Sequence, residues 1–294
     1  MVSFVRTTLV MLVLAGAQSV AARDLDLRRF DEFAQWNERE TALVEDLSDG
    51  KLDDYSPLEA ALVIGGYQDA QIADFHAQLD GCAAKCRRQL NSATSRQARL
   101  RVVFEHLSAD FLQGNYQADL YDVGRTLSLG DFNCLTATIL FQTLCRSFAI
   151  DVDAIWEPSH VRCWSSLSPD AGYLVETTAG ESADAVGAMM LQSRLRARAL
   201  NDTELVAKVF YNRGVRMMKS GEYSLALVST WASCQLDAQD QPAQSNLRAC
   251  LNNWALAAVS AEDLSLAGRL FHQGIKLDPT YEPFKRNQAI LFGQ

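Results

Sequence analysis

The sequence lacks a block of basic residues that could neutralise the phosphates of a nucleic acid. Its 27 Lys and Arg are outnumbered by 36 Asp and Glu, and the formal net charge of −9 is spread along the chain. Proteins that bind nucleic acid gather Lys and Arg on one face, because phosphate contacts dominate their affinity. We therefore expect no nucleic-acid partner.

Beyond its first 22 residues the sequence also lacks any uninterrupted apolar run of about 18 residues, the length that a membrane-spanning helix needs. Within those residues, Arg6 precedes an apolar stretch from Thr8 to Ala17, and Val20 to Ala22 form a small-residue cleavage site. Such an order is typical of a secretory signal peptide, whereas an uncleaved anchor would need a longer apolar stretch. No cysteine follows the stretch, which disfavours a lipoprotein. We expect residues 1–22 to be removed and the rest to be exported, periplasmic or secreted, without a membrane span.

The remaining composition is that of a folded protein. Of the 294 residues, 48% are apolar and 21% are charged. These proportions disfavour a disordered, collagenous or multi-span membrane protein and allow one or two ordinary cores.

Apolar residues recur at helical spacing between residues 24 and 131. Ser56 is suited to cap a helix, since a proline and, two residues further on, a glutamate follow it. The same spacing predicts a helix from Ala70 to Leu90 and another that begins at Arg96.

A central helix and a small sheet should come next. Asp131 is expected to cap a helix that runs from near Asn133 to Phe148 and is apolar almost all round, so that it is buried. The period of the apolar residues then changes to two, which predicts an antiparallel sheet and an α+β fold. The expected strands are Val152–Trp156, His160–Ser165 and Tyr173–Thr177, with residues 168–172 as a turn.

From about Ser182 the sequence predicts helices again, arranged as an internal repeat. Two copies are offset by 41 residues, from Asp237 to Asp278, whereas tetratricopeptide repeats have a period of about 34 residues. About seven residues around Gln239 to Gln244 should therefore be inserted between the copies. Residues 282–291 are expected to form a capping helix. Because two repeats are too few for a free-standing solenoid, the tail should lean on the first domain.

Three residues could form a nucleophilic site. A thiol at the start of the buried helix, Cys134, lies where backbone amides and the helix dipole favour a thiolate, and the amides of Cys134 and Leu135 could bind an oxyanion. A hairpin that pairs His160 directly with Glu176 would centre on residue 168 and place both side chains on one face. Alternation puts Arg162 and Trp164 on the same face, so Trp164 is a candidate wall of the cleft.

Each of these residues also has a plain structural interpretation. Cys134 could be a small buried apolar residue, His160 a hydrogen-bonded structural residue and Glu176 a solvated one. A metal site from His160, Cys163 and Cys134 is a further alternative, as is the separate pair of Cys82 and Cys86. Neither set has the paired short spacings of a structural zinc site, and we expect neither a metal nor another cofactor.

The order of these residues resembles the Cys–His–acid core of the transglutaminase-like superfamily. The similar segments are NCLTATILFQTLCRSFAI with Cys134, EPSHVRCW with His160, and YLVETTAG with Glu176. Upstream, SPLEAALVIGGYQDAQIADFHAQLDGCAAKCRRQL is similar to the helical N-terminal part of bacterial members that end in tetratricopeptide repeats. The resemblance implies a papain-like core over residues 23–185 and a repeat tail over residues 186–294.

The resemblance also implies acyl transfer or amide hydrolysis through a thioester. Cys134 matches the nucleophile, His160 the general base and acid, and Glu176 the acidic member, which is more commonly an aspartate. The chain would then be an exported cysteine amidase, peptidase or acyltransferase whose cleft and repeats bind a protein or peptide substrate. Because many repeat-tailed members have lost the cysteine, the alternative is a non-catalytic scaffold of the cell envelope that binds peptide or glycan. The tail could equally be only a structural brace.

Seven cysteines in an exported chain leave at least one thiol without an intramolecular partner. We expect Cys134 to be that thiol. The expected pairs are Cys145 with Cys163 and Cys234 with Cys250, while Cys82 and Cys86, one helical turn apart, either pair or stay reduced.

Overall fold

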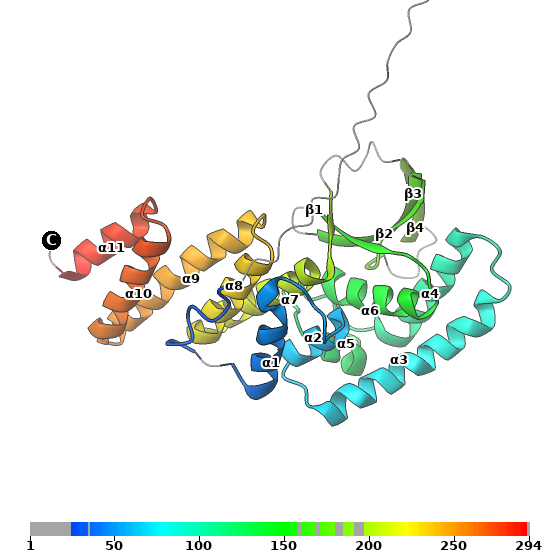
Figure 1. Cartoon of the computed structure of the whole chain (residues 1–294), viewed down its shortest axis with the longest axis horizontal. Coiled ribbons are helices and arrows are strands. Elements are labelled where there is room, and N and C mark those ends of the chain that lie inside the picture. The colour runs from blue at the N-terminus through cyan, green and yellow to red at the C-terminus, as the bar shows by residue number, and fades with distance from the viewer. Residues whose placement is uncertain are drawn as a thin grey trace, which may run out of the picture.

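The computed structural model describes residues 25–34, 36–157, 160–168, 171–179, 185–190 and 197–292 (Figure 1). The expected signal peptide and residues 169 and 170 of the expected turn lie outside these ranges. The fold is mixed α+β, with helices around one five-stranded antiparallel sheet, which confirms the predicted class. None of the described helices is both long and apolar enough to cross a bilayer.

In the part of the chain that the structure describes, six helices and a short 3₁₀ turn precede the sheet. Their bounds are α1 Glu38–Asp46, the 3₁₀ turn Leu47–Asp49, α2 Pro57–Ile64, α3 Asp69–Leu90, α4 Arg96–Phe111, α5 Val123–Leu129 and α6 Cys134–Ser147. The predicted cap of α2 is confirmed, because the Ser56 hydroxyl accepts a hydrogen bond from the Glu59 amide and the Glu59 carboxylate accepts one from the Ser56 amide.

Helix α6 is central and buried, as its composition predicts, but its cap differs from the expected one. The N-cap is Asn133, whose side chain accepts a hydrogen bond from the Thr136 amide. Asp131 accepts hydrogen bonds from the loop before α5 instead, since it lies two residues before the N-cap position, too early to reach the first free amides of the helix.

The sheet has the strand order β4-β3-β2-β1-β5. The strands are β1 Asp153–Glu157, β2 His160–Ser168, β3 Ala171–Val175, β4 Val186–Met190 and β5 Arg198–Leu200. Strands β4 and β5 fall where the sequence predicted helices from Ser182 onward, within the range assigned to the repeats. A short apolar run such as that of β4 does not alternate, so its periodicity cannot distinguish strand from helix.

The hairpin of β2 and β3 has a register two residues away from the expected one. Cys163 pairs with Val175 and Ser165 with Tyr173, so continuing the ladder places Glu176 opposite Arg162 rather than opposite His160. β2 extends to Ser168 and β3 begins at Ala171, so the ladder centres on residue 169 rather than 168, and its register shifts again between Ser166 and Ser168. A shift of two preserves alternation, and His160 and Glu176 therefore remain on one face.

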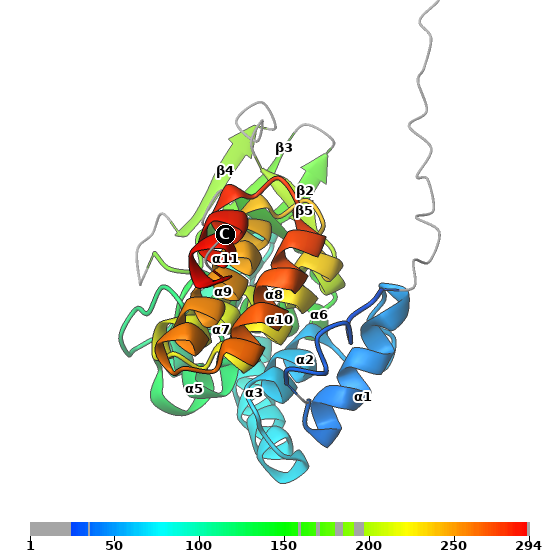
Figure 2. The same cartoon turned by 90° about the vertical axis from the view of Figure 1, so that its left-hand side faces the viewer.

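The chain continues as paired antiparallel helices (Figures 1 and 2). They are α7 Asp202–Ser220, α8 Tyr223–Leu236, α9 Gln241–Ser260, α10 Leu264–Leu277 and α11 Glu282–Phe292, each packed against the next. The residues expected as an insertion around Gln239 to Gln244 do not form a long loop. Gln241 to Gln244 form the start of α9 instead, and this helix spans 20 residues.

The tail and the N-terminal part share one hydrophobic core. Helix α7 packs against α2, and Trp36 meets Phe210 of α7 edge-on with ring centroids 5.9 Å apart. A buried ion pair joins Arg213 of α7 to Glu40 of α1. The first helices of the tail therefore pack on the domain before them, as expected for a tail with too few repeats to be stable alone.

All seven cysteines are free thiols, so the predicted disulfides are wrong. Cys145 and Cys163 are fully buried beside each other without a bond. The Cys250 thiol instead faces the carbonyl of Tyr223 at 3.8 Å, and Cys234 lines a separate hollow of the tail. The fold is held by its apolar core, and an odd cysteine count alone does not single out Cys134.

Candidate active site

Asn133 fixes the position of Cys134. It is fully buried, and its side-chain amide donates to the carbonyls of Ala118 at 3.2 Å and Leu120 at 2.9 Å. These bonds join the start of α6 to the loop before α5, and Cys134 is the first residue of the helix. The amides of Cys134 and Leu135 lie in the first turn of the helix, so no carbonyl of the helix itself can accept from them.

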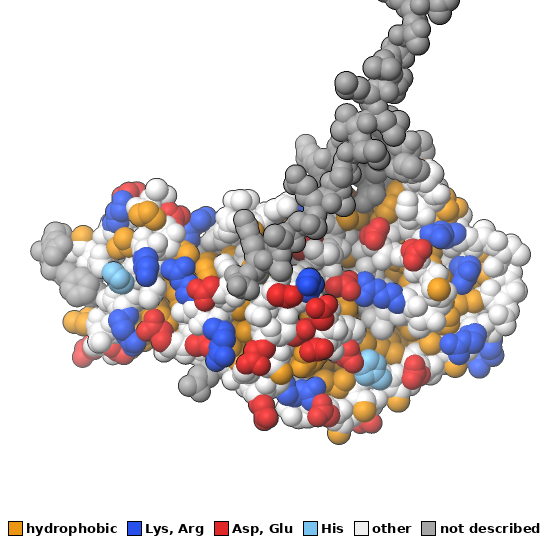
Figure 3. Space-filling view, in the orientation of Figure 1, with side chains coloured by type: hydrophobic (Ala, Val, Ile, Leu, Met, Phe, Trp, Pro, Cys, Tyr) orange, Lys and Arg blue, Asp and Glu red, His pale blue; other side chains and the backbone are white. Residues whose placement is uncertain are grey.

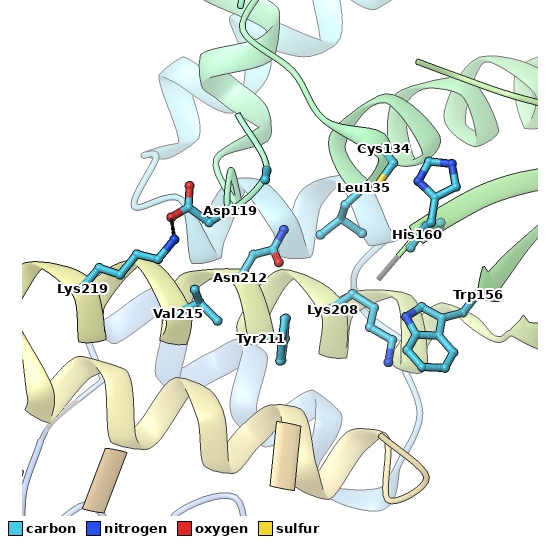
Figure 4. Close-up of a pocket in the computed structure, with 12 residues that line it drawn as sticks. Asp119, Cys134, Leu135, Trp156, His160, Lys208, Tyr211, Asn212, Val215 and Lys219 are labelled. Atoms are coloured by element: carbon cyan, nitrogen blue, oxygen red, sulfur yellow. Dashed lines mark hydrogen bonds and ion pairs between the residues drawn. The ribbon is translucent and has the colours of Figure 1, made fainter. Parts of the chain in front are cut away.

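The structure brings together Cys134, His160 and Glu176. The Nε2 atom of His160 lies 2.8 Å from Oε2 of Glu176, and the side chain of Cys134 hydrogen-bonds the same imidazole. Figure 4 shows the sulfur beside the imidazole at the edge of a cavity. The hydrogen bond with Cys134 and then that with Glu176 raise the pKa of His160 to about 9, although burial opposes the shift.

The Glu176 carboxylate has partners on both oxygens. Oε1 accepts from the Thr178 hydroxyl at 2.6 Å and from the Thr178 amide at 3.2 Å. Oε2 meets the Arg162 guanidinium at 3.3 Å, and Arg162 also pairs with Glu157 at 2.9 Å. Burial alone would raise the pKa of Glu176, but the hydrogen bonds from His160 and Thr178 outweigh it and the pKa lies below its ordinary value. The carboxylate is therefore ionised and held in one orientation.

Tyr116 is a site residue that the sequence did not reveal. Its hydroxyl hydrogen-bonds the side chain of Cys134, and its ring meets that of Phe132 edge-on at 6.0 Å. Burial and the neighbouring Cys134 and Glu176 raise its pKa, so the hydroxyl keeps its proton at neutral pH. The residue lies in an irregular loop without hydrophobic periodicity, which gives no local signal of its position.

Asp131 holds this loop in place. Its carboxylate accepts hydrogen bonds from the Asn115 amide at 2.9 Å, from Gln117 at 2.7 Å and from Arg125 at 2.8 Å. Backbone bonds between Gln117 and Phe132 and between Phe132 and Asn115 add to these. Tyr116 is therefore anchored on both sides.

A cavity of about 270 Å³ opens beside Cys134 and His160. It lies between α7, the loop before α5, the start of α6 and the place where β1 ends and β2 begins. Besides Cys134 and His160 the lining residues are Ala118, Asp119, Leu135, Trp156, Val161, Lys208, Tyr211, Asn212, Val215 and Lys219. Leu135 thus lies at the site as expected, whereas the α7 residues were not predicted.

The prediction that Trp164 forms a wall of the cleft is wrong. Its side chain is 2% exposed and does not line the cavity. The indole packs over Gly172, where a Cβ atom would come within 2.4 Å of the ring. Trp164 shares a face with His160, but four residues along a strand separate the two by about 13 Å. Trp156 of β1 forms part of the cavity wall instead.

The metal alternative finds no support in the part of the chain that the structure describes. No group of three His, Cys, Asp or Glu side chains there has an arrangement that could hold an ion. Cys163 packs against Thr138 of α6, on the face of β2 opposite to His160.

Surface charge is mixed. Figure 3 shows acidic and basic side chains interspersed over the described part of one face, with an acidic group near its middle.

Comparisons of the chain with protein-family models, with curated proteins and with solved structures find no match. Functional inference therefore starts from the geometry around Cys134.

The raised pKa of His160 can be tested by NMR. The chain contains 4 histidines, and the His160 resonance is assigned as the one missing from His160→Ala. We expect its titration midpoint near 9 in the intact protein and a lower value in Cys134→Ala, because the hydrogen bond with Cys134 is the largest cause of the shift. A midpoint near the ordinary value of about 6.5 in the intact protein would contradict the geometry.

Proposed function

We propose that this protein is an exported, transglutaminase-like cysteine enzyme that acts on amide bonds of a protein or peptide. The supporting observation is a single imidazole, His160, that hydrogen-bonds Cys134 and Glu176 at once. Glu176 engages Nε2, which leaves Nδ1 for the sulfur. Such a chain of nucleophile, base and orienting acid is the arrangement that nucleophilic catalysis requires.

The first half of the proposed reaction forms a thioester. The thiolate of Cys134 attacks the carbonyl carbon of an amide, and a carbon–sulfur bond forms while the carbonyl oxygen becomes an oxyanion. His160, as imidazolium, then donates a proton to the amide nitrogen. The carbon–nitrogen bond breaks and the amine leaves.

The second half releases the acyl group. Neutral His160 takes a proton from water or from an acceptor amine, whose oxygen or nitrogen attacks the thioester carbon. The carbon–sulfur bond breaks, and the sulfur returns to its thiolate form beside the imidazolium. Water gives hydrolysis, and an amine gives acyl transfer.

Glu176 acts directly on the imidazole of His160, and Arg162 acts on it through Glu176. The Glu176 carboxylate stabilises the imidazolium and fixes its orientation. Arg162 and Thr178 hold that carboxylate, so both are positioning residues. We propose that the oxyanion is bound by the amide of Leu135 and by the hydroxyl of Tyr116. This hydroxyl hydrogen-bonds the side chain of Cys134.

The proposal assigns separate tasks to the two parts of the chain. Residues 23–185 resemble a transglutaminase-like core, although β4 and β5 complete its sheet beyond that range. The paired helices from α7 onward occupy the place of the tetratricopeptide-like tail, and we propose that they bind the protein or peptide substrate. Such stacked helix pairs offer extended surfaces for a polypeptide.

Product analysis tests the proposal. The intact protein and Cys134→Ala are incubated with a peptide mixture, with and without an amine donor, and the products are identified by mass spectrometry. We expect cleaved, deamidated or amine-linked peptides only with the intact protein, while circular dichroism shows both proteins folded. Identical product profiles would contradict catalysis and favour the non-catalytic peptide- or glycan-binding scaffold.

Tyr116→Phe tests the proposed oxyanion contact. Loss of one oxyanion donor typically lowers kcat by about 10²–10³-fold, and we expect about tenfold to a hundredfold here because Tyr116 is 55% exposed and water can replace it in part. Phenylalanine keeps the ring contact with Phe132. Alkylation of Cys134 by iodoacetamide forms no oxyanion, so its rate should change much less than kcat. An equal change in both rates would place Tyr116 in thiol activation instead.

A further inference from the structure

The tail contributes one wall of the cavity beside Cys134. Five lining residues belong to α7, and their spacing places them on one face of this helix. They are Lys208, Tyr211, Asn212, Val215 and Lys219. Figure 4 shows Asn212 of α7 facing Leu135, next to Cys134, and Lys208 beside Trp156. A group bound next to the sulfur would therefore touch the tail.

Helix α7 is fixed in this position by polar contacts. The Asn212 side chain donates to the carbonyl of Leu120 at 2.9 Å, and Asn133 donates to the same carbonyl. One carbonyl thus joins α7, the loop before α5 and the start of α6. At the other end of the cavity, the buried Lys208 ammonium pairs with Asp237 at 2.7 Å and with Asp240 at 2.6 Å.

The charged side chains of the described lining are already paired. Asp119 and Lys219 meet at 2.9 Å across one end of the cavity. The Lys208 ammonium, held by its two aspartates, lies 4.6 Å from the ring centroid of Trp156. A charged group that entered the cavity would lose water without gaining a free counter-ion, which is unfavourable.

The rest of the lining is mainly apolar. Its apolar members are Ala118, Leu135, Trp156, Val161, Val215 and the ring of Tyr211, and the Asn212 amide is already bonded to Leu120. The volume of about 270 Å³ far exceeds the share of one water, about 30 Å³, and lies just below the range of pockets for drug-sized ligands, about 300–1,000 Å³. A cavity of this volume can hold one or two amino-acid side chains of a substrate.

We propose that this cavity is a substrate subsite for an uncharged apolar side chain, aromatic or branched aliphatic, next to the amide that Cys134 attacks. Val215 and Tyr211 of α7 set this preference, so the tail selects substrate at the reacting centre itself. This inference rests on the proposed function in one respect only, that Cys134 is the reacting group.

The test compares the rates at which three chloroacetamides alkylate Cys134. They are chloroacetamide itself, its N-benzyl derivative, and N-chloroacetylglycine, which carries a carboxylate. Each forms a carbon–sulfur bond with the sulfur and releases chloride. We expect the N-benzyl probe to react about tenfold or more faster than chloroacetamide, and the carboxylate probe to react no faster than chloroacetamide.

Substitution of the cavity wall tests where the preference arises. Val215→Trp should fill the cavity and reduce the ratio of the N-benzyl rate to the chloroacetamide rate towards one. Val215→Ala provides a second, smaller change, which should alter the ratio without crowding the helix. The control is Leu256→Trp, because Leu256 is an exposed residue of α9 outside the cavity. It should keep the ratio, and thermal unfolding reports that each variant is folded.

The two proposals fail in different ways. A wild-type ratio near one, a preference for the carboxylate probe, or a ratio unaffected by Val215→Trp would overturn the apolar subsite. The absolute rate for chloroacetamide and its dependence on His160 instead report the activation of Cys134. The ratio can be measured even if that rate is no faster than the rate of an ordinary thiol.

Discussion

We expect His160→Ala to slow the alkylation of Cys134 by iodoacetamide at pH 6 by about tenfold to a hundredfold. With a pKa of about 9, His160 is an imidazolium at this pH, and we expect a cation beside a sulfur to favour the thiolate. An ordinary thiol with a pKa of about 8.5 has only about 0.3% thiolate at pH 6. The lower nucleophilicity of a stabilised thiolate offsets part of the difference.

The pH dependence of this effect has a definite sign. The pKa of His160 is raised in the folded protein, so its proton is present below pH 9 and is lost as the pH rises through about 9. The advantage of the intact protein over His160→Ala should therefore be largest at low pH and shrink above pH 9. Rates are measured by mass spectrometry of the peptide that contains Cys134.

Selective labelling should be attainable because Cys134 lines the cavity and no other cysteine does. Burial raises the pKa of Cys163, Cys234 and Cys250 to about 12 in each case. The control is His76→Ala, which changes a histidine on α3 that pairs with Glu59 and should leave the rate unchanged. Equal rates in the intact protein and in His160→Ala would remove the support for an activated thiol.

The second large effect is expected at the buried ion pair between α7 and α1. Removing one partner of a buried pair leaves an uncompensated charge and costs about 3–5 kcal/mol. Arg213→Met should lower the free energy of unfolding by this amount, because Arg213 and Glu40 are 6% and 4% exposed. Urea unfolding followed by circular dichroism measures the change.

A double substitution separates the charge from the packing. Glu40→Gln in the Arg213→Met background removes the unpaired carboxylate while its amide oxygen can still accept from Asn37, as Glu40 does now. We expect it to recover much of the lost free energy. Lys285→Met, which breaks the exposed pair with Glu282 on α11, should cost less than about 1 kcal/mol. Similar losses for both single variants would refute a special role for the buried pair.

Local patterns explain the parts of the site that the sequence predicted. Helix α6 begins at Cys134 because Asn133 can cap it, and the strand period places His160 and Glu176 on one face. The register was wrong by two residues, yet the alternation was not, and the long side chains of His160 and Glu176 meet across the remaining offset. The order of these residues in the chain and the alternation of side chains along the strands were therefore sufficient to predict that Cys134, His160 and Glu176 come together.

The remaining parts depend on contacts between residues far apart in the chain. Tyr116 reaches Cys134 only because Asp131 and Asn133 hold its loop, and no periodicity marks that loop. The α7 wall comes from residues that follow the last strand, and the choice between Trp156 of β1 and Trp164 of β2 depends on which end of this strand pair faces the cleft. A sequence pattern contains neither kind of information.

The direct connection between the sheet and the tail has a consequence for substrate length. Strand β5 ends at Leu200 and α7 begins at Asp202, with only Asn201 between them. A polypeptide held on the tail, as we propose, is thus presented to Cys134 by a stiff connection rather than by a flexible linker. Stiff connections give a high effective concentration to a ligand whose span matches the geometry and almost none to others. Reaction should then occur at a set number of residues from the segment that the tail binds.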